Sequence, residues 1–130
     1  MRIILATFLA VLLTLTPALA QFFDYLTFVT VNLSNTAQAA SVSNGPFLAY
    51  NCYNPNVTTT YVQMFDSIGV VTVGTTPAVR FIPLAAQSTT GMQVPSPPLA
   101  FVAGMQVAAT TTQSNGVAPA LPVACEFYYR

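Results

Sequence analysis

The sequence predicts an all-β domain, a sandwich of two antiparallel sheets, after an N-terminal hydrophobic signal helix. Short runs of alternating apolar and polar residues recur along the chain, and turn signals separate them about every 8–12 residues, as is typical of a sandwich. No apolar stripe with helical spacing follows residue 20, and the ten prolines of the chain would interrupt a helix. Ig-like and jelly-roll-like connections both fit this pattern.

Residues 1–20 are expected to be a signal peptide. A positively charged start and an apolar run over residues 3–15 are followed by a Thr-Pro pair. Ala18-Leu19-Ala20 then has the small-x-small pattern that signal peptidase accepts. The run is shorter than the roughly 20 residues that span a bilayer, but two phenylalanines after the cleavage site extend it, so an uncleaved membrane anchor is the alternative. The mature chain, residues 21–130, would form a single domain.

About eight short strands are expected in this domain, and breaks in the alternation set their limits. The extended runs are residues 23–33, 47–53, 61–66, 70–73, 78–84, 99–102, 105–111 and 122–130, with a short run at 92–94. Residues 34–45 and 87–91 are expected to be loops. In the run 78–84, Val79 and Phe81 are predicted to face the core and Arg80 the solvent or a neighbouring subunit, because strand side chains alternate.

The mature chain has very few charged side chains. Arg80 and Arg130 stand against Asp24, Asp66 and Glu126, a net charge of −1 (2 − 3), and there is no histidine. Nucleic-acid binding through a basic patch is excluded, because it needs several Lys or Arg on one face. A neutral, apolar domain has poor colloidal stability. We therefore expect copies of the chain, associating through edge strands near the first or last predicted strand, or another protein, to cover its surface.

Sequence motifs for catalysis are weak. General acid–base chemistry usually needs a His or paired carboxylates, whereas Asp24, Asp66 and Glu126 are far apart on different expected strands. Two cysteines are too few for a zinc site, and Gly69 and Gly74 are too isolated for a phosphate-binding loop. We therefore predict that the protein is not an enzyme and has no metal or cofactor.

The two cysteines, Cys52 and Cys125, are predicted to form a disulfide. Cys125 is in phase with Phe127 on the apolar side of the last strand, and Cys52 is in phase with Leu48 and Tyr50. A signal peptide would deliver both to an oxidising compartment, where an even number of cysteines is normally paired. The alternative is a pair of buried thiols in a cytoplasmic protein.

Several aromatic residues are candidates for an interaction surface: Tyr50, Tyr53, Tyr61, Tyr128 and Tyr129. Aromatic faces beside Asn and Gln can stack on sugars or anchor a protein partner. The alternative is that half of them simply fill the core, because Tyr and Phe are ordinary strand residues.

Two long stretches carry a family resemblance. AYNCYNPNVTTTYVQMFD (residues 49–66), followed by VTVGTTPAVRFIPL (71–84), resembles the YNPN…YVQxF…TVGTTxP pattern of small β-domains in tailed-phage virion structural and decoration proteins. GMQVPSPPLAFVAGMQVAAT (91–110) is similar to the later half of that family. The resemblance covers residues 47–130 and implies a non-catalytic capsid- or tail-associated module without active-site residues.

Two features depart from that family. Phage virions assemble in the host cytoplasm, where a signal peptide is unexpected, and the pair Cys52 and Cys125 is not part of the pattern. Both favour the alternative of a secreted or envelope-attached bacterial β-sandwich binding protein. The expected location is therefore periplasmic or extracellular if the signal peptide is cleaved, and the virion otherwise.

Overall fold

A computed structural model of the chain describes residues 26–41, 44–93 and 98–130. The expected signal peptide, the alternative anchor and the start of the first expected strand lie outside these residues. Within them, no helix has the length and apolar character needed to cross a membrane.

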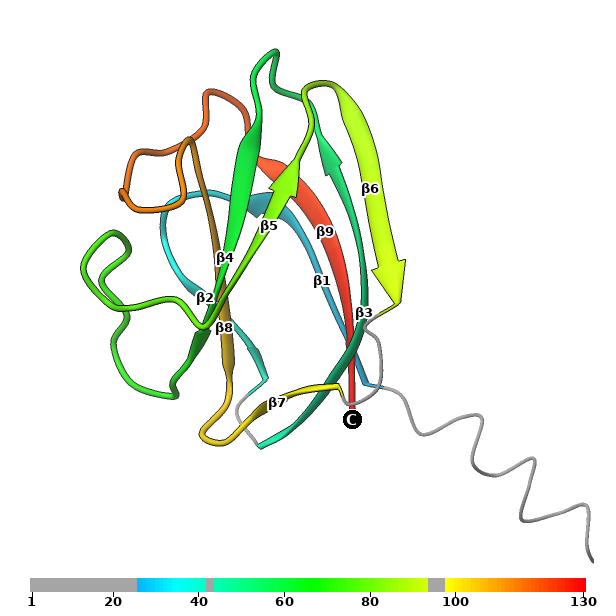
Figure 1. Cartoon of the computed structure of the whole chain (residues 1–130), viewed down its shortest axis with the longest axis vertical. Helices are drawn as coiled ribbons and strands as arrows, with labels where there is room; N and C mark the ends of the chain where they lie inside the picture. Colours follow the sequence, from blue (N-terminus) through cyan, green and yellow to red (C-terminus); the bar gives the residue numbers. More distant parts are fainter. Residues whose placement is uncertain (1–25, 42–43, 94–97) are drawn as a thin grey trace, which may run out of the picture.

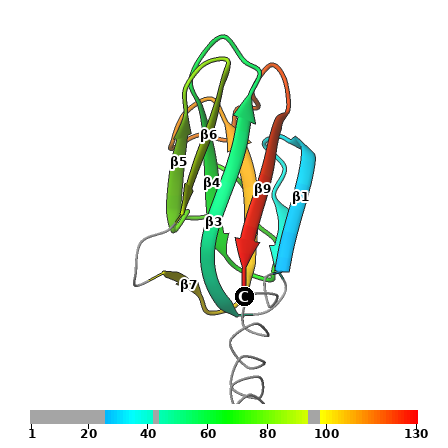
Figure 2. The same ribbon diagram turned by 90° about the vertical axis from the view of Figure 1, so that its right-hand side faces the viewer.

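The described residues form an antiparallel β-sandwich, which confirms the predicted fold class. The strands are β1 (Leu26–Leu33), β2 (Gln38–Ser41), β3 (Gly45–Asn54), β4 (Thr60–Asp66), β5 (Arg80–Leu84), β6 (Ser88–Gln93), β7 (Leu99–Phe101), β8 (Met105–Thr110) and β9 (Val123–Tyr129). Sheet A has the order β1-β9-β3-β6, with β7 also paired to β3, and sheet B has the order β2-β8-β4-β5. The two sheets face each other, with β5 and β6 at one open side of the sandwich (Figures 1 and 2).

The core lies between the sheets, and alternation along the strands fills it. In β9, Val123, Cys125 and Phe127 are buried, whereas the residues between them are only half-buried. Phe47 is central to one end of this core, since its ring lies 6.2 Å from that of Phe127 and 6.5 Å from that of Phe101. Such aromatic contacts add to the stabilisation from burial alone.

The predicted facing of the run 78–84 was wrong for Val79 and Phe81, which are 49% and 36% exposed. Arg80 is exposed, as predicted, although it is in phase with Ile82. Ile82 is 4% exposed and occupies the inward side of β5. The reason is the register with β4, in which Ile82 lies opposite Val62, a fully buried residue. Residues on opposite strands project to the same face, so β4 determines the facing of β5.

Other differences concern strands that depend on partners. Residues 38–41 and 88–91 were expected in loops but are strands, because they pair with β8 and β3 respectively. Residues 70–73 were expected to be a strand but lie in a loop. The first strand, β1, is an edge of sheet A, which agrees with an edge near the first or last strand, whereas β9 itself lies inside the sheet between β1 and β3.

Two loops, residues 67–79 and 111–122, cover the outer face of sheet B. Beneath them Phe65 is fully buried, although it lies outside the core between the sheets. Gln106 donates from Nε2 to the carbonyls of Ser67 and Gly69, and Gln63 bonds residues of the second loop. Among the described residues no buried polar side-chain atom lacks a hydrogen-bond partner. The central strands of sheet B, β4 and β8, are therefore largely buried on both faces, while sheet A leaves its outer face open.

Candidate functional site

The disulfide between Cys52 and Cys125 is confirmed. The two residues lie directly opposite each other on β3 and β9, with their Cα atoms 4.1 Å apart and 73 positions between them in sequence. Both side chains are buried on the inward side of sheet A. The bond joins neighbouring strands of one sheet, so these cysteines have a structural role.

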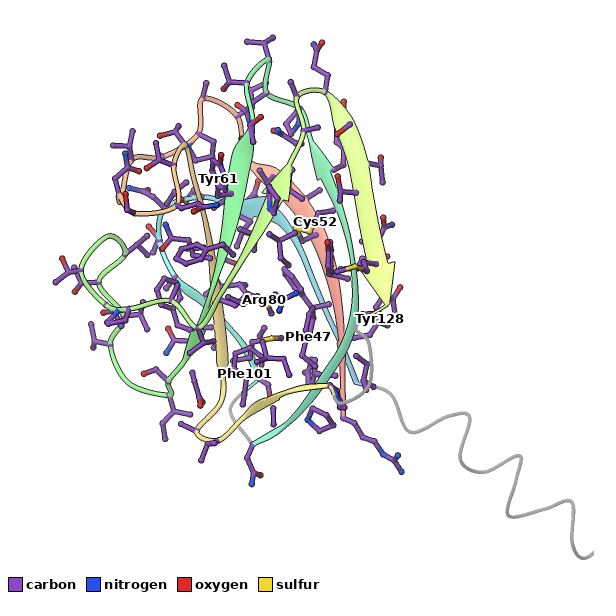
Figure 3. The ribbon with its side chains drawn as sticks, in the orientation of Figure 1. Phe47, Cys52, Tyr61, Arg80, Phe101 and Tyr128 are labelled. Carbon is purple, nitrogen blue, oxygen red and sulfur yellow. A yellow bond between two sulfur atoms is a disulfide. The ribbon has the colours of Figure 1, made fainter. Side chains whose placement is uncertain are left out.

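The five candidate tyrosines do not form one surface. Tyr50 is only 7% exposed and points between the sheets, and Tyr129 packs against the same core. Tyr61 is on sheet B, across the sandwich from Tyr128 (Figure 3). Only Tyr53 and Tyr128 share the outer face of sheet A. Leu48 was expected on the same side of the strand as Tyr50 and Cys52, but the bulge of β3 between Phe47 and Ala49 takes it out of phase with them.

The outer face of sheet A carries two tyrosines with a polar pair between them. Tyr53 is 49% exposed on β3 and lies opposite Ala124 of β9. Tyr128 follows Ala124 by four residues along β9, and the facing pair Asn51 and Glu126 lies between the two tyrosines. At the usual rise of a strand, the two tyrosines are about 13 Å apart along the strands. Tyr128 donates its hydroxyl to Glu126 Oε2 at 3.1 Å, and this bond and the nearby negative charge raise the pKa of Tyr128.

The packing beside this polar pair is tight. Gly91 on β6 lies next to Asn51, and a Cβ atom at this glycine would come within 3.2 Å of Asn51 Oδ1. Tyrosines beside polar side chains can contact a protein or a sugar ring.

The described carboxylates do not form a catalytic pair. Asp66 accepts hydrogen bonds from the backbone N–H groups of Val102 (3.0 Å), Ala103 (2.8 Å) and Gly104 (3.3 Å), and these bonds hold the pKa of Asp66 below its usual range. Its role is to fix the turn between β7 and β8, while Glu126 lies on sheet A. No group of three potential metal ligands occurs in the described part of the chain.

Asn54 is a buried polar centre that lies just after the expected run 47–53. It is 0% exposed, and its Nδ2 group donates to the carbonyls of Thr58, Leu84 and Ala85 at 3.0–3.1 Å. Its Oδ1 atom accepts from the backbone N–H and side-chain Nδ2 of Asn56 and from the hydroxyl of Thr60. Asn54 is two residues after Cys52 and so lies on the same inward side of β3, which is the feature of the sequence that could have predicted its burial. Asn54 therefore has a structural role.

Asn56 extends this network to the loop before β9. Its Nδ2 donates to the carbonyl of Leu121 at 2.9 Å, and its Oδ1 accepts from the Leu121 N–H at 2.7 Å. Its own carbonyl accepts from the N–H of Gln87, which has a positive φ of 48° in the turn between β5 and β6. Asn54 and Asn56 thus hold together the β3–β4, β5–β6 and β8–β9 connections at one end of the sandwich.

The 67–79 loop presents apolar side chains to solvent. Val70 is 96% exposed, Ile68 is 68% exposed and Val79 is 49% exposed, and the loop contains no charged residue. The turn at its centre is ordered by hydrogen bonds of Thr72 with Thr75 and Thr76. These apolar groups are therefore held in solvent by a defined backbone.

Close contact with the second loop fixes the position of the 67–79 loop. Gly74 has a φ of +89°, which favours glycine, and an added Cβ there would lie 2.6 Å from the backbone nitrogen of Gly116. A Cβ at Gly116 would in turn lie 2.5 Å from the carbonyl oxygen of Val73. The two backbones pack so closely that neither glycine can be replaced without a shift.

The fold has a distant likeness to that of a plant-virus coat protein. The chain is similar to the coat protein of Tobacco streak virus, with 9% sequence identity, a TM-score of 0.40, and coverage of 81% of this chain and 83% of that chain. At this score the likeness carries no functional argument. No family model matches the chain, and no curated protein matches it.

Proposed function

We propose that this protein is a non-catalytic structural module that presents an apolar surface to other proteins, including copies of itself, and that it does so as a virion-associated capsid or tail decoration protein. The observation that carries the proposal is the ordered, uncharged 67–79 loop with Val70 and Ile68 in solvent. Exposed apolar groups held by a defined backbone are typical of protein contact sites, because no folding cost is paid when the partner binds.

The virion role rests on the family resemblance. The TVGTTP segment of that pattern is residues 72–77, which form the centre of the exposed loop. The other part of the pattern, YNPN, supplies the buried asparagines that hold one end of the sandwich.

Self-association through the loop can be tested by introducing a charge. Val70→Lys should lower the oligomeric fraction in sedimentation velocity at high protein concentration, without a change in melting temperature, because the side chain is 96% exposed. Val57→Lys is the matched control, since Val57 is 77% exposed in the turn between β3 and β4. A monomeric parent, or equal effects of both substitutions, would contradict contact through this loop.

A second candidate is a secreted or envelope-attached binding protein, and the disulfide favours it. Paired cysteines persist mainly in oxidising compartments and on exposed surfaces. Mass spectrometry of purified virions and of the exported fraction distinguishes the two candidates. A disulfide-bonded chain that begins at Gln21 and is found only in the exported fraction would support the second candidate and contradict the first.

A further inference from the structure

A small pocket opens between the two sheets at the side where β5 and β6 are the free edges. It has a volume of about 100 Å³. Its lining is mainly apolar: Phe47, Tyr50, Phe81, Ile82, Pro83, Met92 and Leu99, together with Arg80. Figure 3 shows Arg80 directed from β5 into the space between the sheets, near Phe47. A single cation therefore lies at the mouth of an apolar pocket.

The charge of Arg80 is not balanced by the described part of the protein. The two acidic residues that the structure describes are engaged elsewhere, Asp66 with the β7–β8 turn and Glu126 with Tyr128 on the outer face of sheet A. No described residue accepts a hydrogen bond from Arg80. Because the inward phase of β5 is set by Ile82 and its buried partner Val62, the guanidinium is aimed at the pocket by the fold itself.

Tyr50 adds a second donor to the same pocket. Its ring stacks on Phe47, with ring centroids 6.2 Å apart, and its hydroxyl has no hydrogen-bond partner among the described residues. Burial raises the pKa of Tyr50, and the positive charge of Arg80 opposes this shift. The hydroxyl is therefore protonated at neutral pH and can donate. Guanidinium and phenol provide N–H and O–H donors toward the pocket, and the apolar side chains provide no acceptor.

We propose that this pocket binds a small organic carboxylate with an apolar body, with the carboxylate on Arg80 and Tyr50 and the apolar part against Phe47, Ile82 and Met92. A carboxylate matches the planar guanidinium and balances its single charge. The volume is below the 150 Å³ that accommodates benzene in an engineered cavity, so a short aliphatic chain is a suitable body. This inference is independent of the proposed function.

The test compares butyrate with butyramide, which has nearly the same shape but no charge. Each is titrated into the purified, disulfide-bonded protein, and amide resonances of β5 and β6 are followed by NMR. We expect saturable shifts with butyrate and binding weaker by about tenfold or more with butyramide, the loss expected for a charged hydrogen bond. No saturable shift with butyrate, or affinity for butyramide within threefold of that for butyrate, would overturn the proposal.

Variants assign the binding to the two donors. Arg80→Gln should weaken butyrate binding by about tenfold or more, and Tyr50→Phe by about fivefold, the effect of one neutral hydrogen bond. Arg130→Gln is the matched control, because Arg130 is also exposed but does not line this pocket. Unchanged binding by Arg80→Gln, or an equal loss in Arg130→Gln, would show that the pocket does not recognise the carboxylate.

Discussion

Asn54 offers the most informative test of the physical account of this fold. Replacement by alanine removes a side chain that is 0% exposed and makes six hydrogen bonds at the end of the sandwich. The groups that lose a partner belong to two segments that are far apart in the chain: residues 56–60, in and just after the β3–β4 turn, and residues 84–85 at the end of β5. One substitution therefore affects both sheets.

The magnitude follows from these bonds. At about 1 kcal/mol of net stabilisation each, six bonds set an upper value of about 6 kcal/mol for the loss in the free energy of unfolding. The carbonyls of Thr58 and Ala85 lie in part-buried bonds and can regain water, whereas the Leu84 carbonyl lies in a buried bond. We therefore expect Asn54→Ala to cost about 3–5 kcal/mol, a large part of the 5–15 kcal/mol typical of a domain.

The assay is urea unfolding followed by far-UV circular dichroism, with Asn51→Ala as control. Asn51 is on the same strand but exposed on the outer face, so its loss should change stability by less than about 0.5 kcal/mol. Asn54→Asp keeps the size but places a carboxylate against three carbonyl oxygens, and it should be nearly as damaging at pH 7.

The aspartate variant also gives a pH test. The buried carboxyl would have a raised pKa in the folded state, so the deficit of Asn54→Asp relative to the parent should narrow as the pH falls toward about 4. A cost of Asn54→Ala within 1 kcal/mol of that of Asn51→Ala would refute the role of Asn54 as a structural centre.

Three further predictions concern the stability of the folded protein. Ile82→Ala should cost about 2–5 kcal/mol and Phe81→Ala clearly less, because Ile82 is 4% and Phe81 36% exposed, and the reverse order would contradict the register of β5. Replacing Cys52 and Cys125 together with alanine should lower stability by about 4 kcal/mol in the chain-entropy model for a separation of 73 residues, and a loss below 1 kcal/mol would argue against it. Asp66 has a lower pKa in the folded protein than in the unfolded chain, where it is about 4, so its ionised form stabilises the fold above pH 4. This stabilisation is lost as the pH falls through the pKa of the folded state. Melting temperatures of Asp66→Asn and of the parent are compared between pH 2 and pH 7. The variant should melt at a lower temperature than the parent at pH 7, and the two should converge in acid. A difference that does not change with pH would show that ionised Asp66 does not stabilise the fold.

The local part of this fold could be predicted from the sequence by itself. The alternation of β9 predicted correctly that Cys125 and Phe127 face inward, because successive strand side chains point to opposite faces whatever the partner. The same rule placed Cys52 on an inward face and led to the disulfide. Fold class, strand positions and this pairing all depend on a period of two residues and on turn residues, which are properties of short segments.

The candidate site, by contrast, was decided by tertiary structure. The 67–79 loop was predicted to contain a strand because its valines favour one, but no strand pairs with it, and Val70 is left in solvent. Arg80 points to the pocket because Ile82 lies opposite buried Val62, which no feature of residues 78–84 specifies. Burial of Asn54 depends on carbonyl groups that come together only when β4 and β5 pair. Which face of a strand is inward, and which polar groups find partners, are set by contacts between residues far apart in the chain, and alternation within one segment fits either choice.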